Sequence, residues 1–238
     1  MTGRALVTGG SAGIGRAVVE RLAADGYECV VFDRVAPEGD LPGRWFEVDL
    51  GNRLDTAVAL ERALSSGPIT RLVNNVGVVR PGALEEASPA DFDTAVSLNL
   101  RCALQCTQAL VPGMKAERFG RIVNISSRAA LGKELRSVYS ATKAGLHGFV
   151  KTWALELGAF GITANAIGPG PIRTALFEAA NPPDSPRTRA IIEGVPVKRM
   201  GKPEDIAQAA SFFLDARSGF VTGQVLYVCG GMTVGAAG

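Results

Sequence analysis

The sequence predicts one α/β domain, a doubly wound parallel sheet of seven strands with helices on both faces. Short apolar segments that end in glycine or polar residues alternate along the chain with longer segments of helical periodicity. The chain has 238 residues, of which 47% are hydrophobic, so it can bury one large core. Neither a linker composition nor a repeat divides it, and we therefore treat residues 1–238 as a single domain.

Charge and hydropathy argue against several classes of protein. The formal net charge is +2, with the two signs interspersed and no basic run suited to nucleic acid. No stretch approaches 18 consecutive apolar residues, and residues 3–8 resemble a buried strand rather than part of a signal peptide. We therefore expect a cytoplasmic protein that contacts neither membrane nor nucleic acid.

Four scattered cysteines and a single histidine favour neither a disulfide framework nor a metal site. The histidine, His147, follows Tyr139 by eight residues on one predicted helix, which is more typical of a packing residue than of a hydrolase base. We expect no bound metal and no ordinary Ser-His-Asp hydrolase.

Each predicted element follows from its local pattern. The strands are apolar runs that end at turn residues, at 4–8, 28–33, 44–48, 71–77 (running into a polar turn), 120–127, 162–167 and 224–228. The helices have a period near 3.6 residues, at 14–24, 54–64, 89–115, 138–157 and 202–214. Residues 35–43 are too few for a crossover helix, and residues 173–195, with three prolines, are expected to be an irregular lid.

The first predicted turn has the composition of an anion site. Gly9, Gly13 and Gly15 are spaced G-x3-G-x-G between a strand and a helix. Glycines there let backbone amides approach a pyrophosphate at the positive end of the helix dipole. A P-loop fits poorly, because Arg16-Ala17 stands where Lys-Ser/Thr is required.

The second strand ends in Asp33, about twenty residues past the glycines. A carboxylate there accepts hydrogen bonds from an adenosine ribose and repels a 2′-phosphate. This favours NAD over NADP, although the adjacent Arg34 could pair with a 2′-phosphate and keeps NADP as the alternative.

Tyr139 and Lys143 are one helical turn apart and share a face of the predicted helix. A nearby ammonium favours the phenolate, so the tyrosine could exchange protons nearer neutral pH. Polar residues also occur at two predicted strand ends, Asn74-Asn75 and Ser126-Ser127, and Asn99 lies within an apolar helical pattern. Buried polar side chains need hydrogen-bond partners.

In chain order these features resemble the short-chain dehydrogenase/reductase family in its single-domain form, over nearly the whole length. The motifs are Thr8-Gly9-x3-Gly13-Ile14-Gly15, Asn74-Asn75-x-Gly77, Asn99, Ser127, Tyr139-x3-Lys143, Asn165 and Pro169-Gly170-x-Ile172-x-Thr174. Each is weak alone, whereas their joint occurrence in this order is specific. The resemblance implies a Rossmann-like fold and a nicotinamide dinucleotide.

The resemblance also implies a catalytic set. Tyr139 would exchange the proton with the substrate oxygen, and Ser127 would hydrogen-bond that oxygen, with Ser126 as the competing serine. Lys143 would bind the nicotinamide ribose and lower the tyrosine pKa, and Asn99 would hold a water relay leading to that lysine.

By the same resemblance, the glycine turn would hold the pyrophosphate, Asp49-Leu50 the adenine, and Ile172 with Thr174 the carboxamide end. The full expected cofactor set is Gly9, Ser11, Gly13, Ile14, Gly15, Asp33, Arg34, Asp49, Leu50, Asn75, Val76, Gly77, Tyr139, Lys143, Pro169, Gly170, Ile172 and Thr174.

The chain departs from the family pattern at three places. Val76 replaces the usual alanine after the paired asparagines, and Cys229 stands where an aspartate commonly precedes the closing glycines. The 35–43 connection lacks room for the family's usual helix, so that side of the adenosine pocket is expected to be more open.

The closest subgroup by motif resembles 3-oxoacyl-carrier-protein reductases and related secondary-alcohol dehydrogenases. Arg118 fits a carrier-protein reductase, but Phe160 stands where a second basic residue is common. With Asp33, this favours an NAD-linked dehydrogenase of a small-molecule alcohol or ketone. An NADPH-dependent carrier-protein reductase is the first alternative, and a dinucleotide-binding regulator without turnover is the second.

The substrate pocket is expected between residues 129–136 and 173–195. Its walls would be apolar through Leu131, Leu135, Leu176 and Phe177, whereas Lys133 and Arg136 would face solvent or an acidic substrate. The resemblance also implies a homotetramer or homodimer, formed through helices 89–115 and 137–158 and the C-terminal strand.

Overall fold

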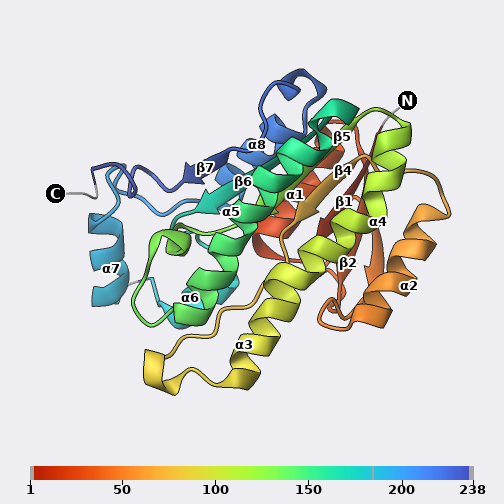
Figure 1. Cartoon of the computed structure of the whole chain (residues 1–238). Coiled ribbons are helices and arrows are strands. Elements are labelled where there is room, and N and C mark those ends of the chain that lie inside the picture. Colours follow the sequence, from red (N-terminus) through yellow and green to blue (C-terminus); the bar gives the residue numbers. More distant parts are fainter. Residues whose placement is uncertain (1–2, 184, 236–238) are drawn as a thin grey trace.

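The computed structural model describes residues 3–183 and 185–235, which form a seven-stranded sheet in the order β3-β2-β1-β4-β5-β6-β7 (Figure 1). Every strand pair is parallel. The strands are β1 (Arg4–Thr8), β2 (Glu28–Asp33), β3 (Arg44–Glu47), β4 (Arg71–Asn74), β5 (Gly120–Ile125), β6 (Ile162–Pro169) and β7 (Val225–Val228). The predicted doubly wound parallel sheet is confirmed. Its strand order reverses between β1 and β4, where ligands bind in such sheets.

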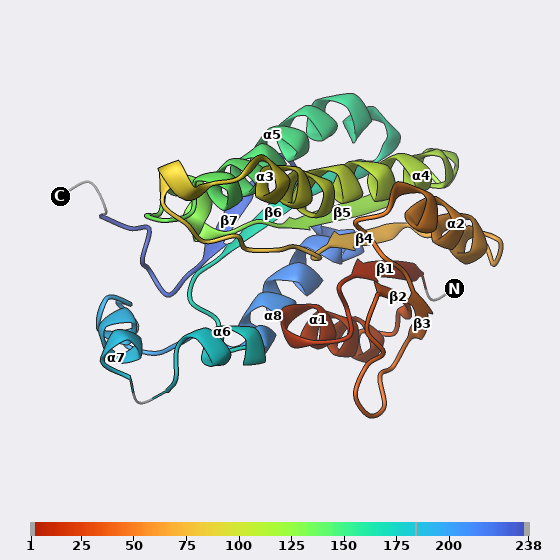
Figure 2. The same ribbon diagram turned by 90° about the horizontal axis from the view of Figure 1, so that it is seen from below.

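Helices cover both faces of the sheet, as Figure 2 shows. On one face α2 (Arg53–Leu64), α4 (Cys102–Ala116) and α5 (Ser137–Leu157) pack over a cluster that includes Leu72 and Ile122. On the other face α1 (Gly13–Ala24) and α8 (Pro203–Leu214) pack over Val7 and Ile167. Burial of these two apolar layers stabilises the sheet by about 25 cal/mol for each Å² removed from water.

Two predicted elements differ from the structure. Residues 89–115 form α3 (Pro89–Val96) and α4 with a π-helical turn, Ser97–Arg101, between them, so the expected uninterrupted helix is wrong in detail. The segment 173–195 is not irregular, because it holds α6 (Ala175–Ala180) and α7 (Pro186–Glu193). The side chains of Thr174 and Ser185 cap these two helices by accepting hydrogen bonds from backbone N–H groups.

Short 3₁₀ turns complete the fold, at Leu84–Glu86, Arg128–Leu131, Gly158–Phe160 and Ala216–Ser218. The β2–β3 connection contains no helix, as predicted. All four cysteines are buried, and none forms a disulfide. Among the helices of the described ranges, none is long and apolar enough to cross a bilayer.

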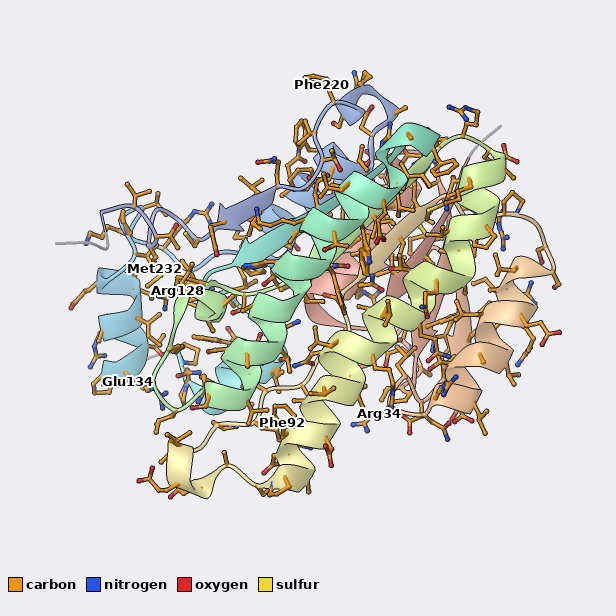
Figure 3. The ribbon with its side chains drawn as sticks, viewed as in Figure 1. Arg34, Phe92, Arg128, Glu134, Phe220 and Met232 are labelled. Atoms are coloured by element: carbon orange, nitrogen blue, oxygen red, sulfur yellow. The ribbon has the colours of Figure 1, made fainter. Side chains whose placement is uncertain are left out.

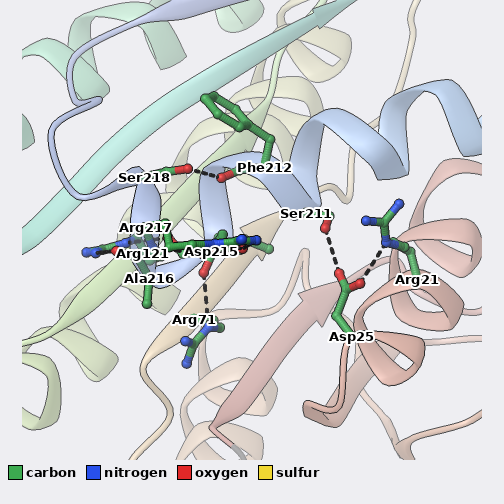
Figure 4. Close-up of polar contacts among 11 residues, drawn as sticks. Arg21, Asp25, Arg71, Arg121, Ser211, Phe212, Asp215, Ala216, Arg217 and Ser218 are labelled. Atoms are coloured by element: carbon green, nitrogen blue, oxygen red, sulfur yellow. Dashed lines mark hydrogen bonds and ion pairs between the residues drawn. The ribbon is translucent and has the colours of Figure 1, made fainter.

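Buried arginines connect the sheet to the C-terminal end of α8 (Figure 4). Arg71 Nε donates to the Leu214 carbonyl at 3.1 Å, and Arg121 Nε and Nη2 donate to the Asp215 and Ala216 carbonyls at 3.2 and 3.0 Å. The guanidinium groups thus satisfy backbone acceptors that the helix end leaves unpaired. These contacts lie far from the carboxyl ends of the strands and serve the fold.

Candidate active site

The glycine turn after β1 leaves room and donors for an anion. Gly9 has φ +66°, and a Cβ on Gly15 would lie 2.0 Å from the Gly9 carbonyl oxygen, so only glycine fits position 15. The N-cap residue of α1, Ala12, offers no side-chain cap, which leaves the first N–H groups of the helix available. The Ser11 hydroxyl is buried and has no partner among the described residues. These features fit a pyrophosphate at the N-terminus of α1.

Asp33 lies beside this turn. Its Oδ2 accepts a 3.1 Å hydrogen bond from the Ser11 N–H, and its Oδ1 accepts one of 3.3 Å from Val35. The carboxylate is half-buried, whereas the adjacent Arg34 is exposed (Figure 3). The acid therefore lies where an adenosine ribose would follow a pyrophosphate on the glycine turn.

Tyr139 and Lys143 lie together on α5, with Lys143 Nζ 5.8 Å from the centre of the tyrosine ring. Lys143 is buried and donates a 2.7 Å hydrogen bond to the Ile125 carbonyl. Burial lowers the pKa of Lys143 to about 8. It also raises the pKa of Tyr139, against the opposing effects of a hydrogen bond with Ser127 and the charge of Arg136. The expected lowering of the tyrosine pKa by Lys143 is therefore not found in this structure.

The two candidate serines face different ways. Ser126 Oγ donates to the Lys143 carbonyl at 2.9 Å and lies 2.8 Å from His147 Nε2, inside the packing of α5. Ser127 instead hydrogen-bonds Tyr139, and its Oγ accepts from the Ala129 N–H at 3.1 Å. Only Ser127 is thus directed towards the tyrosine. His147 also contacts Tyr227 edge to face, as a packing residue would.

Asn99 lies in the π-helical turn and bridges three segments. Its Oδ1 accepts from the Val78 N–H at 2.8 Å, and its Nδ2 donates to the Val78 carbonyl at 3.1 Å and to Thr142 Oγ1 at 2.9 Å. A Cβ on Gly77 would lie 3.0 Å from Asn99 Oδ1 and 3.1 Å from Lys143 Nζ. Asn99 and Lys143 therefore meet at Gly77, and π-helical turns are frequent at functional sites.

The remaining predicted cofactor residues border the same edge of the sheet. Thr174 lies over the glycine turn, since its Cγ2 would be 3.4 Å from a Cβ on Gly13. Asn75 Nδ2 donates to the Thr8 and Gly9 carbonyls at 3.0 and 2.9 Å, which ties β4 to the turn. Ile172 is buried and forms an isolated bridge with Gly201. The others lie at the ends of β3, β4 and β6, namely Asp49, Leu50, Val76, Pro169 and Gly170.

Comparison with known proteins gives the family. The family model described as Enoyl-(Acyl carrier protein) reductase matches residues 9–233. The chain belongs to the short-chain dehydrogenase/reductase family.

Its relatives are similar over nearly their full lengths. The chain is 38% identical to (2S)-[(R)-hydroxy(phenyl)methyl]succinyl-CoA dehydrogenase subunit BbsD of Thauera aromatica, over 97% of this chain and 96% of that protein. It is 34% identical to the 3-oxoacyl-[acyl-carrier-protein] reductase FabG of Thermotoga maritima, over 96% and 97%. A solved structure from Agrobacterium tumefaciens with bound NADP has a TM-score of 0.88 at 34% identity, covering 97% of this chain and 96% of that one. The chain is accordingly an oxidoreductase that acts on CH–OH or keto groups.

Sequence reasoning missed two residues that support this dehydrogenase/reductase site. Thr142 holds the amide of Asn99, and its own Oγ1 donates to the Tyr139 carbonyl at 2.9 Å. Arg16 donates to the Glu38 and Asp40 carbonyls at 2.6 and 2.7 Å and so holds the β2–β3 loop against α1. Thr142 lies inside the Tyr139-x3-Lys143 motif, so its position in the sequence could have indicated that it lies close to the site. No sequence pattern joins Arg16 to a loop twenty residues later.

Proposed function

We propose that this protein is an NAD-linked oxidoreductase that interconverts a secondary alcohol and a ketone, with Tyr139 as the acid/base. The observation that carries the proposal is the Tyr139–Ser127 hydrogen bond, with Lys143 one helical turn further along α5. One proton donor and one hydrogen-bond donor could then act on the same substrate oxygen. The glycine turn from Gly9 to Gly15 would hold a nicotinamide dinucleotide, which would supply or accept the hydride.

The residues of the chain then have distinct roles. In the direction of reduction, Tyr139 gives its proton to the oxygen of the keto group, and in oxidation it takes that proton back. The Ser127 hydroxyl donates a hydrogen bond to the same oxygen, which stabilises the negative charge that develops there. Lys143 holds a positive charge within reach of the tyrosine, and Asn99 fixes the backbone at Val78 beside it.

Asp33 supports the choice of NAD. Its carboxylate is half-buried and already oriented by the Ser11 N–H, so a 2′-phosphate beside it would meet an unfavourable charge. Two observations favour NADP instead. Arg34 is exposed next to the acid, and the related structure from Agrobacterium tumefaciens holds NADP. A carrier-protein reductase that uses NADPH is therefore the second candidate, in keeping with the FabG relative.

A panel of ketones and alcohols, assayed with NADH and NADPH in parallel, tests the proposal. We expect kcat/KM to be at least about tenfold higher with NADH, because repulsion of a 2′-phosphate beside a half-buried carboxylate is on the order of 1.4 kcal/mol or more. Asp33→Asn should reduce that preference, while Glu38→Gln in the loop that follows β2 should leave it unchanged. A preference for NADPH in the unaltered protein would replace the first candidate by the second.

We also infer a cytoplasmic homo-oligomer. Of the surfaces that the family resemblance implicates, α5 carries Leu155 at 87% exposure. Phe220, in the connection between α8 and the C-terminal strand, is 102% exposed and protrudes in Figure 3. Apolar groups of that size in water are typical of a surface that another subunit covers. Sedimentation of the protein and of Phe220→Asp tests this, since a monomer in both cases would contradict it.

A further inference from the structure

A hollow open to solvent lies near Tyr139, and half of the residues that line it are cations. It has a volume of about 650 Å³ and lies between the segment leading into α5 and the start of α7, on the side of the molecule where Figure 3 labels Arg128 and Glu134. Leu131 and Leu135 contribute apolar wall, whereas Leu176 and Phe177, which we also expected in the substrate pocket, do not line this hollow. The charged side chains that line it are Arg128, Lys133, Glu134, Arg136 and Arg187.

These cations come from two segments of the chain, since Arg128, Lys133 and Arg136 lie within residues 128–136 and Arg187 lies on α7. Arg128 follows Ser127 directly, Arg136 is the N-cap residue of α5, and Arg187 is the second residue of α7. The pKa of Lys133 is lowered, first by burial and then by the positive charges of Arg136, Arg128 and Arg187. The fold thus holds four cations around one hollow although they repel one another.

Few acidic groups of the described residues neutralise these cations. Among the residues that the structure describes, Glu134 is the only carboxylate in the wall, and no carboxylate forms an ion pair with any of the four cations. Arg136 Nη1 has only the Leu135 carbonyl at 2.8 Å. By contrast, Arg173, at the base of α6, is paired with Glu178. Unpaired guanidinium groups around a cavity are suited to carboxylate or phosphate.

Two residues of the hollow are also close to the proposed catalytic pair, Ser127 and Tyr139. Arg136 is close enough to Tyr139 to lower the pKa of that phenol, and Arg128 adjoins Ser127. A substrate whose keto oxygen lay between Ser127 and Tyr139 would extend into the hollow with the remainder of its chain.

Resting on the proposed function, we propose that the substrate carries an anionic group, carboxylate or phosphate, which Arg128, Lys133, Arg136 and Arg187 bind beyond the reacting carbon. Two kinds of compound could supply it. One is a keto acid whose own carboxylate lies a few bonds from the ketone, and the other is a keto thioester whose phosphate lies on its coenzyme A or 4′-phosphopantetheine part. Either group would relieve the repulsion among the cations, and in dilute salt it would be attracted from a distance.

Two matched substrate pairs test the proposal and separate the sources. The monoethyl and diethyl esters of 3-oxoadipate differ by one carboxylate, and acetoacetyl-4′-phosphopantetheine and acetoacetyl-pantetheine differ by one phosphate. We expect the charged member of at least one pair to have a kcat/KM about tenfold or more above its neutral partner, as hydrogen bonds to a charged group provide. Added NaCl should shrink that ratio. Equal kcat/KM within both pairs would overturn the proposal while leaving the oxidoreductase assignment intact.

The double variant Lys133→Gln, Arg136→Gln should lower the charged-to-neutral ratio about tenfold. The ratio is the necessary readout, because loss of Arg136 also alters Tyr139 and affects both members of a pair alike. The control double variant Arg53→Gln, Arg62→Gln removes the same amount of positive charge from two exposed positions on α2. It should not change the charged-to-neutral ratio. An unchanged ratio in the first double variant would refute the assignment of these side chains.

Calorimetric titration of coenzyme A and of adipate into the NAD-saturated protein gives a readout that needs no turnover. The anion site is supported if the Kd of either ligand rises about tenfold in the Lys133/Arg136 variant and does not change in the α2 variant. This holds even if no ketone of the panel is reduced. In that event the proposed function fails and the anion site stands. If no ketone of the panel is reduced, the absence of detectable binding of either anion rejects the site as well.

Discussion

Lys143 Nζ donates a 2.7 Å hydrogen bond to the main-chain carbonyl oxygen of Ile125, the last residue of β5. This bond fixes the buried ammonium at the carboxyl edge of the sheet, between Tyr139 and Gly77. A charge held in so little water is unfavourable for folding, and burial accordingly lowers the pKa of Lys143 to about 8. The site therefore retains a group that destabilises the protein.

The first prediction concerns the pH dependence of stability. Below pH 8 Lys143 is protonated in both folded and unfolded chains, so the unfavourable burial is fully present. Between pH 8 and about 10.5 the folded chain loses the proton first, so stability rises with pH. Lys143→Met lacks this gain, and the stability of the variant relative to the unaltered protein should fall over that range by on the order of 3 kcal/mol.

Urea unfolding of both proteins without cofactor, at pH 7 to 10, measures this difference. Lys151→Met on the same helix is the matched control, because Lys151 is exposed and should give an offset that does not vary with pH. A constant offset for Lys143→Met as well would show that burial of the charge is not the governing effect.

The second prediction separates the two adjacent serines. Ser127→Ala removes the proposed hydrogen bond to the substrate oxygen and should lower kcat by about 10²- to 10³-fold. It also removes the bond from the Ala129 N–H, so its free energy of unfolding should fall by about 1 kcal/mol. Ser126→Ala removes the bonds to the Lys143 carbonyl and His147, and should lower the free energy of unfolding by a similar amount without the loss of kcat. Steady-state kinetics on the folded variants distinguish them, and a large loss of kcat in Ser126→Ala alone would make Ser126 the catalytic serine.

The third prediction concerns Tyr139 and pH. Because burial raises the pKa of Tyr139, the phenol is protonated at neutral pH and fit to reduce a ketone. Oxidation needs the phenolate, so kcat/KM for the alcohol should increase with pH from 7 to 10. Arg136→Gln removes a charge that lowers this pKa, and should move the profile to higher pH.

Tyr139→Phe should abolish the profile and lower turnover by about 10²- to 10⁴-fold. Cofactor binding, followed by NADH fluorescence, should remain, which separates a catalytic loss from a folding defect. Retained turnover in this variant would exclude the tyrosine as the acid/base and favour a site that binds dinucleotide for another purpose.

Local sequence signals predicted most of the elements, and their failures have physical causes. β1 and β2 end where glycine or an acid interrupts an apolar run, and both ranges were predicted correctly. The helix α7 was missed because its prolines indicated a loop. Ser185-Pro186 is nevertheless the same cap-and-proline signal that correctly predicted the start of α3 at Ser88-Pro89.

The features of the site that depend on tertiary contacts could not be predicted from local sequence patterns. The Tyr139–Lys143 pairing follows from helical spacing alone, whereas the sign of the tyrosine pKa shift depends on how much water the fold excludes. Likewise Arg128 and Arg187 are separated by almost sixty residues, and only the packing of α7 beside the α5 entry brings them to one hollow.

The last prediction concerns Arg16, which holds the helix-free connection between β2 and β3. Its guanidinium donates to the Glu38 and Asp40 carbonyls and also pairs with Glu20 at 2.8 Å. Arg16→Ala should free residues 35–43, increase their rate of amide hydrogen exchange and raise the Kd for NAD by about three- to tenfold, since a loop that must be ordered on binding weakens affinity.

Glu20→Gln is the matched control, because it removes the ion pair and keeps both carbonyl contacts. Arg16→Lys separates charge from geometry, since an ammonium lacks the planar fork that reaches two carbonyls at once. We expect the lysine variant to behave like alanine and the Glu20 variant to behave like the unaltered protein. If the lysine variant binds NAD normally, the charge of Arg16 rather than its hold on the loop determines cofactor affinity.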